Sequence, residues 1–478
     1  MFVSQNQTYG KRWPSVCLSA CYTTTWDSIL ATTATSNISI TARANHRACQ
    51  MLNGKVLLVG GDEDRYNPSM NIYDPATETF TRSLAYPSVV RYYQAGSGST
   101  YSSFAIVNLS DGKVWIGGAT ALNDDPSGGY EIYDPVTDQI TEYTIVNNPD
   151  DPYSFPRIQP VDEAYYIGNN QIMMFFSFGS QGILDLNTSF IHIIANDKLQ
   201  GIGSMTGTST IQDINGDIWQ IGGQTQPGGT LPNGGSWATI FKFTVATQTW
   251  SRMHDMNTLR DGAGLAILPG NKIGIYGGEQ YGVTVPLESV EIYDEATDTC
   301  TASVDLVGQR VMASTTFLQT GYVLIAGGVN SKGSPEDSEL AHNSLLNPVF
   351  SGSTGTMTTT RYGHTATPLG NGLVLMAGGN GNSSDGTIMA NTSAELFDPQ
   401  AKLYINFTSE QIAVGGTMQF SALDATGATV TPTWSVDNQT LATIDSTGLL
   451  TTLVAGEINI TATSGTDSAL VRIQILPQ

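Results

Sequence analysis

Short apolar runs that end in Gly-Gly recur along the whole chain at a spacing of about fifty residues. They read VLLVGG ending at Gly61, VWIGG at Gly118, IWQIGG at Gly223, IGIYGG at Gly278, VLIAGG at Gly328 and LVLMAGG at Gly379. A degenerate seventh copy, IMMFFSFG, ends at Gly179. Each run is too short for a helix and is bounded by turn residues, so the pattern predicts β-strands.

Turn signals on both sides of these runs predict how the strands connect. Tight-hairpin dipeptides precede most runs: Asn53-Gly54, Asp111-Gly112, Asn215-Gly216 and Asn371-Gly372. A second motif follows downstream, as Tyr73-Asp74-Pro75, Tyr133-Asp134-Pro135, Tyr293-Asp294, Leu346-Asn347-Pro348 and Phe397-Asp398-Pro399, mostly with a Thr-rich segment behind it. Asp initiates a turn and Pro presets φ, so each copy predicts a further hairpin. Each repeat therefore supplies about four strands, which is the pattern of a propeller blade.

The order of turn, apolar strand, Gly-Gly, strand and Tyr-Asp-Pro resembles the Kelch repeat over residues 43–400. Six good copies and one worn copy imply a seven-bladed β-propeller, which we place at residues 37–402. In related propellers an N-terminal strand often completes the last blade. We expect residues 37–42, NISITA, to fill that place as its outer strand.

The pattern changes near Leu403, where alternating strands with Gly turns replace the Gly-Gly rhythm. Residues 403–478 resemble the bacterial immunoglobulin-like domain of group 2. The matching residues are Val414-Gly415, Trp434, Ala442, Asp445, Gly448, Ala455-Gly456 and Ile460-Thr461-Ala462. The resemblance implies a β-sandwich with Trp434 in its core. The fold class is thus all-β, with a seven-bladed propeller followed by an immunoglobulin-like sandwich, and residues 1–36 form an N-terminal extension that would serve as an anchor.

Arginines that precede the first strand of most blades are the main candidates for binding. They are Arg43, Arg91, Arg157, Arg260, Arg310 and Arg361. A ring of arginines at one face would bind an anionic sugar or carboxylate through forked hydrogen bonds. Tyr93 and Tyr362, with Tyr92 and Tyr101 nearby in sequence, would add aromatic faces. The alternative is that the arginines tie the blades together through loop carbonyls and acids.

The net charge disfavours two classes of binding partner, and the cysteine content disfavours a disulfide-stabilised fold. The formal net charge of −22 opposes binding to nucleic acid and to anionic membranes. No apolar stretch is long enough to span a membrane, and the first residues lack a signal-peptide pattern. Four cysteines, Cys17, Cys21, Cys49 and Cys300, are too few for a disulfide scaffold.

The combination of domains is similar to that of galactose oxidase and its relatives, whose copper site uses a Cys-crosslinked Tyr, a Tyr-His pair and a further His. None of the five histidines, His46, His192, His254, His342 and His364, follows a tyrosine. No hydrolase elbow, zinc motif or sialidase repeat is present either. Acidic pairs such as Asp150-Asp151 are expected to be solvated loop residues. The residues therefore predict no catalytic set, no metal and no cofactor.

These observations favour a non-enzymatic surface protein, in particular a phage virion component such as a tail fibre, receptor-binding protein or capsid decoration. Its partners would be other virion or cell-surface proteins, with host-surface glycan as a further candidate and a homo-oligomer as its possible state. It would lie on the virion surface. The alternative is a secreted, extracellular copper enzyme like galactose or glyoxal oxidase, or a secreted lectin.

Overall fold

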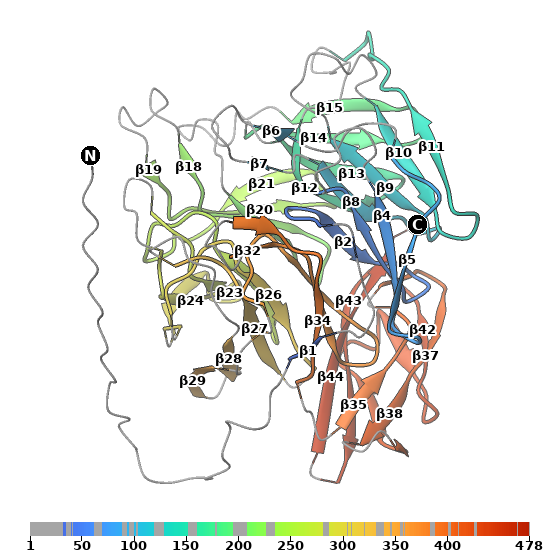
Figure 1. Ribbon diagram of the computed structural model, residues 1–478, viewed down its shortest axis with the longest axis vertical. Helices are drawn as coiled ribbons and strands as arrows, with labels where there is room; N and C mark the ends of the chain where they lie inside the picture. The colour runs from blue at the N-terminus through green and yellow to red at the C-terminus, as the bar shows by residue number, and fades with distance from the viewer. Residues whose placement is uncertain are drawn as a thin grey trace.

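The computed structural model describes residues 32–477 with gaps. The gaps are residues 35–39, 41, 62–68, 88–92, 95–99, 102–103, 119–128, 152–159, 177–178, 195–207, 226–234, 281–285, 304, 307, 320, 331–338, 345–346, 354–356, 358, 383–387, 400–402, 410, 425–427 and 466. Side chains at a few further strand positions also lie outside the description. Every regular element in the described part is a β-strand (Figure 1).

Seven four-stranded antiparallel sheets precede Leu403 in the described part of the chain. We call them blades one to seven. The strands of each blade are given from the first strand outward. Blade one comprises β2 (Arg47–Gln50), β3 (Val56–Val59), β4 (Met70–Asp74) and β5 (Thr79–Arg82), and blade two comprises β8 (Phe104–Asn108), β9 (Val114–Gly118), β10 (Tyr130–Asp134) and β11 (Gln139–Tyr143). Blade three comprises β12 (Val161–Gly168), β13 (Gln171–Phe176), β14 (Gln181–Asp185) and β15 (Phe190–Ile194), and blade four comprises β16 (Ser209–Gln212), β17 (Ile218–Ile221), β20 (Ile240–Thr244) and β21 (Thr249–Arg252).

Blades five to seven follow the same order. Blade five comprises β22 (Gly264–Leu268), β23 (Lys272–Tyr276), β24 (Val290–Asp294) and β25 (Thr299–Ala302). Blade six comprises β26 (Ser314–Phe317), β27 (Tyr322–Ala326), β28 (Glu339–Ser344) and β29 (Asn347–Ser353). Blade seven comprises β30 (Thr365–Pro368), β31 (Val374–Ala377), β34 (Ala394–Phe397) and β1 (Thr32–Ala34). Three short hairpins extend from the blades: β6 (Tyr93–Gln94) with β7 (Thr100–Tyr101), β18 (Gln224–Thr225) with β19 (Gly235–Ser236), and β32 (Asn380–Asn382) with β33 (Ile388–Ala390).

The blades close into a ring through their first strands. β2 contacts β8, β8 contacts β12, β16 contacts β22, β22 contacts β26, β26 contacts β30, and β30 contacts β2. Blades three and four share an apolar cluster that includes Met173, Phe175 and Phe241. The architecture is therefore a β-propeller, as the repeats predict.

Burial explains why the Gly-Gly runs are continuously apolar. All four residues of β3 are completely buried, because the second strand of a blade packs against neighbouring blades on both faces. The outer strand β5, with the sequence TFTR, is largely exposed. Between them, the Asp74 carboxylate accepts a hydrogen bond from the Ala76 amide at 3.0 Å and shapes the turn predicted from Tyr-Asp-Pro.

The seventh blade is completed by an N-terminal strand, but at residues other than those expected. Strand β1, Thr32–Ala34, pairs with β34, whereas residues 37–42 were expected to do so. Arg43 already pairs with Asn391 on its way to the first strand of blade one. Crossing a four-stranded sheet spans about 14 Å and needs about four residues. A strand that ended at residue 42 would leave no residues for this crossing, so the propeller begins before residue 37.

The first glycines of four Gly-Gly pairs lie against the next blade; they are Gly222, Gly277, Gly327 and Gly378. Gly327 has a φ of +64°, and a β-carbon built on it would lie 2.0 Å from the carbonyl oxygen of Arg361. Gly321 has a φ of +82° with nothing within 4 Å of the same added atom. Both glycines therefore adopt a left-handed backbone conformation, but only at Gly327 would a side chain also collide with a neighbouring atom.

We expect Gly327→Ala to destabilise the fold by about 2 kcal/mol more than Gly321→Ala, which should cost about 1–2 kcal/mol for its backbone conformation alone. Urea unfolding followed by tryptophan fluorescence measures both. Equal losses in the two variants would show that the contact between blades six and seven tolerates a methyl group.

Residues from Leu403 onward form the separate immunoglobulin-like sandwich. Its sheets comprise β35 (Leu403–Asn406), β38 (Ser421–Asp424) and β39 (Thr429–Val430); β36 (Gln411–Ala413), β44 (Asp467–Leu476), β43 (Gly456–Ser464) and β40 (Thr433–Val436); β37 (Thr417–Gln419), β42 (Leu449–Thr452) and β41 (Ala442–Ile444). Ile405, Phe420 and Ile473 belong to its core, against which the partly buried Trp434 packs.

The sandwich docks on one face of the propeller (Figure 1). Its backbone amides at Glu457, Leu470 and Phe407 donate to the carbonyls of Ile214, Gln319 and Gly370 at 2.5, 2.9 and 2.8 Å. These three partners lie in turns between first and second strands. The loops that carry Arg260, Arg310 and Arg361 before the first strands, and the Gly-Gly pairs after the second strands, lie at the other end of the same strands. We call the face at that end the arginine-loop face. The sandwich covers the opposite face.

Candidate functional site

The arginines on the arginine-loop face are buried inside the blades. Arg361 is fully buried and donates from Nη1 to the carbonyls of Gly378 and Ser393 at 2.7 and 3.1 Å. Its Nη2 donates to the Ser393 hydroxyl at 3.1 Å and to the buried Glu395 carboxylate. Every one of these partners belongs to the arginine's own blade.

Arg43, Arg260 and Arg310, the other described members of this set, also bind groups of their own blades. Arg260 donates to the carbonyls of Gly277 and Ser289 at 2.8 and 2.9 Å and to Glu291 at 2.7 Å. Arg43 donates to the Gly60 carbonyl at 2.8 Å and to the Asn71 side chain at 2.6 Å. Arg310 donates to the Gly327 carbonyl at 3.0 Å.

The backbone of the same arginines joins each blade to the preceding one. The second glycine of a Gly-Gly pair donates to the carbonyl of the arginine in the next blade: Gly278 to Arg310 at 3.1 Å, Gly328 to Arg361 at 3.0 Å, and Gly379 to Arg43 at 2.8 Å. The last of these bonds closes the ring. Each arginine is therefore a clamp that holds its own blade with its side chain and the preceding blade with its carbonyl.

This geometry corrects the expectation that Arg43, Arg260, Arg310 and Arg361 bind an anionic ligand. Their exposed fractions are 0%, 0%, 5% and 0%, so they offer no accessible ring of cations. The alternative interpretation, that they tie blades together, accounts for their contacts. Each of these guanidinium groups binds a glycine carbonyl that lies 17 residues further along the chain, so the repeats alone did not predict this burial.

The remaining candidates are only partly described. Arg91 and Arg157 lie outside the described residues, and Tyr93 is described only as backbone in the β6–β7 hairpin. Tyr362 is partly buried, its backbone pairs with Asn380, and burial raises the pKa of its phenol. A binding role for Arg91, Tyr93, Arg157 and Tyr362 stays a prediction.

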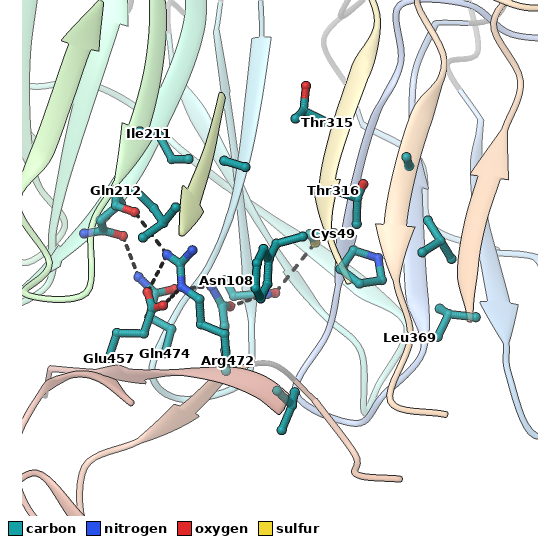
Figure 2. A pocket seen from close by; sticks show the side chains of 18 of the residues that line it. Cys49, Asn108, Ile211, Gln212, Thr315, Thr316, Leu369, Glu457, Arg472 and Gln474 are labelled. Carbon is teal, nitrogen blue, oxygen red and sulfur yellow. Dashed lines mark hydrogen bonds and ion pairs between the residues drawn. The ribbon is translucent and has the colours of Figure 1, made fainter. Parts of the chain in front are cut away.

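A cavity of about 440 Å³ occupies the channel between the first strands and the docked sandwich (Figure 2). A chain of side-chain amides crosses the junction between the two domains beside it. The Asn108 amide donates to Gln411 at 2.6 Å, Gln411 to Gln474 at 2.6 Å, and Gln474 to Gln212 at 2.5 Å. Arg472 pairs with Glu457 next to them. The sandwich is therefore joined at this end of the channel to blade two through Asn108 and to blade four through Gln212.

Cys49 lines this cavity, on the side that the sandwich covers. Its thiol donates to the Asn108 side chain at 3.6 Å, and burial raises its pKa to about 12. A thiol that stays protonated is a poor nucleophile. Cys300 is buried in blade five, where its thiol donates to Glu291 at 3.3 Å.

The histidines do not form a metal site in the described part of the molecule. His46 and His364 lie at blade seams, where their Nε2 atoms contact the hydroxyls of Thr365 and Ser314 at 2.8 and 2.9 Å. Burial, with a smaller effect of nearby arginines, lowers the pKa of His364 to about 3 and that of His46 well below its usual value. His192 is exposed and pairs with Asp151.

Copper therefore does not fit the described residues in the way known from galactose oxidase. No group of three or more His, Cys, Asp or Glu side chains suited to a metal occurs among them. The sequence also lacks the adjacent Tyr-His pair.

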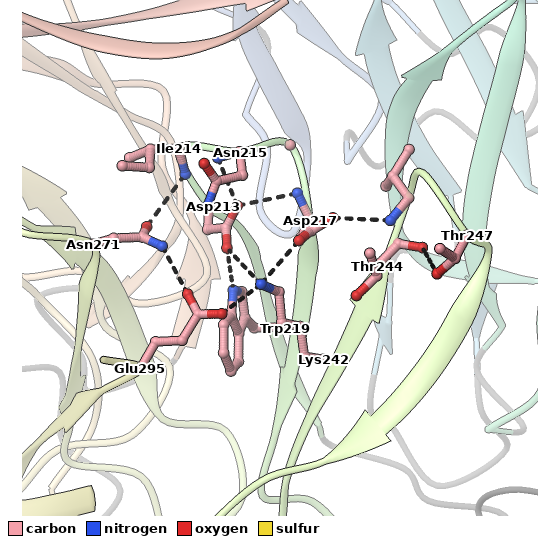
Figure 3. Close-up of polar contacts among 12 residues, drawn as sticks. Asp213, Ile214, Asn215, Asp217, Trp219, Lys242, Thr244, Thr247, Asn271 and Glu295 are labelled. Carbon is pink, nitrogen blue, oxygen red and sulfur yellow. Dashed lines mark hydrogen bonds and ion pairs between the residues drawn. The ribbon is translucent and has the colours of Figure 1, made fainter. Parts of the chain in front are cut away.

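Two clusters of polar side chains form only when folding brings distant parts of the chain together. One surrounds Lys242, whose ammonium contacts Glu295 at 2.5 Å, Asp217 at 2.9 Å and Asp213 at 3.9 Å (Figure 3). Trp219 donates its indole N–H to Asp213 at 2.8 Å. The other is the pair Asp261 and Glu279 on the arginine-loop face. Neither cluster has a motif spacing, because each joins segments that lie at least 18 residues apart in the sequence.

Among the residues described, no helical segment has the length and apolarity needed to cross a bilayer.

Comparisons with known proteins give three findings. No curated protein sequence matches this chain. Residues 404–473 match the family model described as bacterial Ig-like domain (group 2). A solved structure described as a novel fungal alcohol oxidase with catalytic diversity among the AA5 family, in complex with copper, shares the fold with a TM-score of 0.61 and 11% identity; the match covers 94% of this chain and 100% of that one.

The whole-chain likeness corrects the functional expectation. A solved structure that shares this fold over its full length is that of an alcohol oxidase, which contradicts a non-enzymatic phage virion component and gives no support to a location on the virion surface. At 11% identity the likeness establishes the fold and leaves the reaction open. The C-terminal segment matches the bacterial immunoglobulin-like family of group 2, and the chain as a whole is similar in fold to a copper alcohol oxidase.

Proposed function

We propose that this protein is an extracellular enzyme that oxidises hydroxyl-bearing compounds, alcohols or carbohydrates. The observation that carries the proposal is the shared fold with an alcohol oxidase over 94% of this chain, which includes both the propeller and the sandwich. Likeness over both domains supports a common working unit better than likeness over a propeller alone, because propellers host many unrelated functions.

The reaction would take place on the arginine-loop face. The sandwich covers the opposite face, where the Asn108, Gln411, Gln474 and Gln212 amides join the two domains. Substrate would therefore approach the loops that connect the blades on the open face, as active sites commonly lie on loops held by a rigid scaffold.

The experiment is an oxidase assay on the purified full chain, before and after incubation with Cu²⁺ and removal of excess metal. Oxygen consumption and hydrogen peroxide formation are measured with galactose, glycerol and simple primary alcohols. We expect substrate-dependent oxygen consumption, and elemental analysis of the same protein gives its metal content. Folded protein that consumes no oxygen with any of these substrates, both before and after incubation with Cu²⁺, would overturn the proposal.

A cysteine variant provides a further prediction. Cys49 lies in the channel half that the sandwich covers, so we expect Cys49→Ser to change the turnover rate less than twofold. A complete loss of activity in folded Cys49→Ser would instead assign this thiol to the active site and contradict the placement of the reaction on the open face.

A further inference from the structure

Asp261 and Glu279 lie directly opposite each other on the arginine-loop face of blade five. The Asp261 amide donates to the Glu279 carbonyl at 2.9 Å, and the Glu279 amide donates back to the Asp261 carbonyl at 2.9 Å. Residues that exchange both backbone hydrogen bonds have α-carbons about 5.5 Å apart and side chains on the same face. Two carboxylates are thus held side by side.

The other blades show that the fold does not require acids here. The equivalent bridged pairs are Val311 with Val329 in blade six and Tyr362 with Asn380 in blade seven. Like charges directly opposite each other destabilise a strand pair. Blade five therefore carries a costly pair where its neighbours carry neutral residues.

The described surroundings provide no positive charge for this pair. Asp261 is 4% exposed, and its Oδ1 atom has no hydrogen-bond partner. The guanidinium of the adjacent Arg260 is bound to Glu291, and that of Arg310 binds the Gly327 carbonyl. Burial, and then the charge of Glu279, raise the pKa of Asp261 to about 7, and burial raises that of Glu279.

We propose that Asp261 and Glu279 form a binding site for a hard divalent cation of the calcium type. Calcium prefers carboxylate oxygens and completes its coordination with water when the protein supplies few ligands. The cation would replace the proton that Asp261 otherwise carries below its raised pKa and would neutralise both carboxylates. Because only two side chains of the described residues contribute, we expect a dissociation constant of about 10⁻⁴–10⁻³ M.

The test measures calcium binding to the purified full chain by isothermal titration calorimetry at pH 8 and pH 5. The key variant is Asp261→Val/Glu279→Val, which copies the pair of blade six and is expected to fold. Wild type should bind one more Ca²⁺ per chain than this variant at pH 8. At pH 5 the affinity of that site should fall at least tenfold, because protons compete for the carboxylates.

Asp255→Asn serves as the matched control, since Asp255 is an exposed acid that pairs with Arg252. It should keep the full stoichiometry. Asp261→Asn, which preserves shape, should lose the site as the valine variant does. Equal calcium stoichiometry in wild type and in either folded variant of the pair would overturn the proposal and show that these carboxylates bind no calcium. Neither outcome depends on oxidase activity.

Discussion

Arg361→Ala is expected to destabilise the propeller by about 3–5 kcal/mol. The Arg361 guanidinium and the Glu395 carboxylate are both fully buried and paired with each other. Removing the arginine would leave the carboxylate buried without its counter-charge, and would also free the carbonyls of Gly378 and Ser393 from their partner. The free energy of unfolding in urea, followed by tryptophan fluorescence, measures the loss.

Two further variants separate the charge from the loss of packing. Arg252→Ala removes an arginine that is 56% exposed in its pair with Asp255, and should cost less than about 1 kcal/mol. Arg361→Met/Glu395→Leu replaces the buried pair by apolar side chains and should recover most of the loss. If Arg361→Ala costs no more than Arg252→Ala, the clamp interpretation is wrong.

Lys242→Met is expected to destabilise the protein by about 3–5 kcal/mol at pH 7. Lys242 is the ammonium group among the carboxylates of Asp213, Asp217 and Glu295, and its side chain is only 12% exposed. Burial already raises the pKa of Asp213, against the lowering effects of the Trp219 hydrogen bond and of Lys242. Without the ammonium, this pKa should rise further.

The sign of the pH dependence follows from that rise. A carboxyl whose pKa is higher in the folded state than in the unfolded state makes folding less favourable as pH increases through the window between the two values. The loss in Lys242→Met should therefore be largest at neutral pH and shrink below about pH 4. Lys113→Met, which removes an exposed lysine paired with Asp111, should cost under about 1 kcal/mol with no such trend. A loss in Lys242→Met that is constant between pH 4 and pH 8 would contradict the electrostatic explanation.

The amino-acid sequence by itself determined the repeating sheets and the C-terminal sandwich. Both depend on local patterns: four apolar residues before Gly-Gly predict a strand buried on both faces, as β3 is, and Tyr73-Asp74-Pro75 predicts the turn that the Asp74 carboxylate caps. The resemblance to related propellers also implied a closing strand from the N-terminus, which β1 provides at residues 32–34 instead of residues 37–42.

Only the tertiary structure decided what the arginines and acids do. Whether Arg361 faces the channel or the blade interior depends on strand register, and the register came from packing against Gly378 and Glu395, which lie 17 and 34 residues away. The meeting of Asp261 with Glu279, and of Lys242 with Glu295, likewise depends on which strands become neighbours. Local patterns specify strands and turns because their causes lie within a few residues, whereas burial and charge pairing arise between residues that only the closed ring brings together.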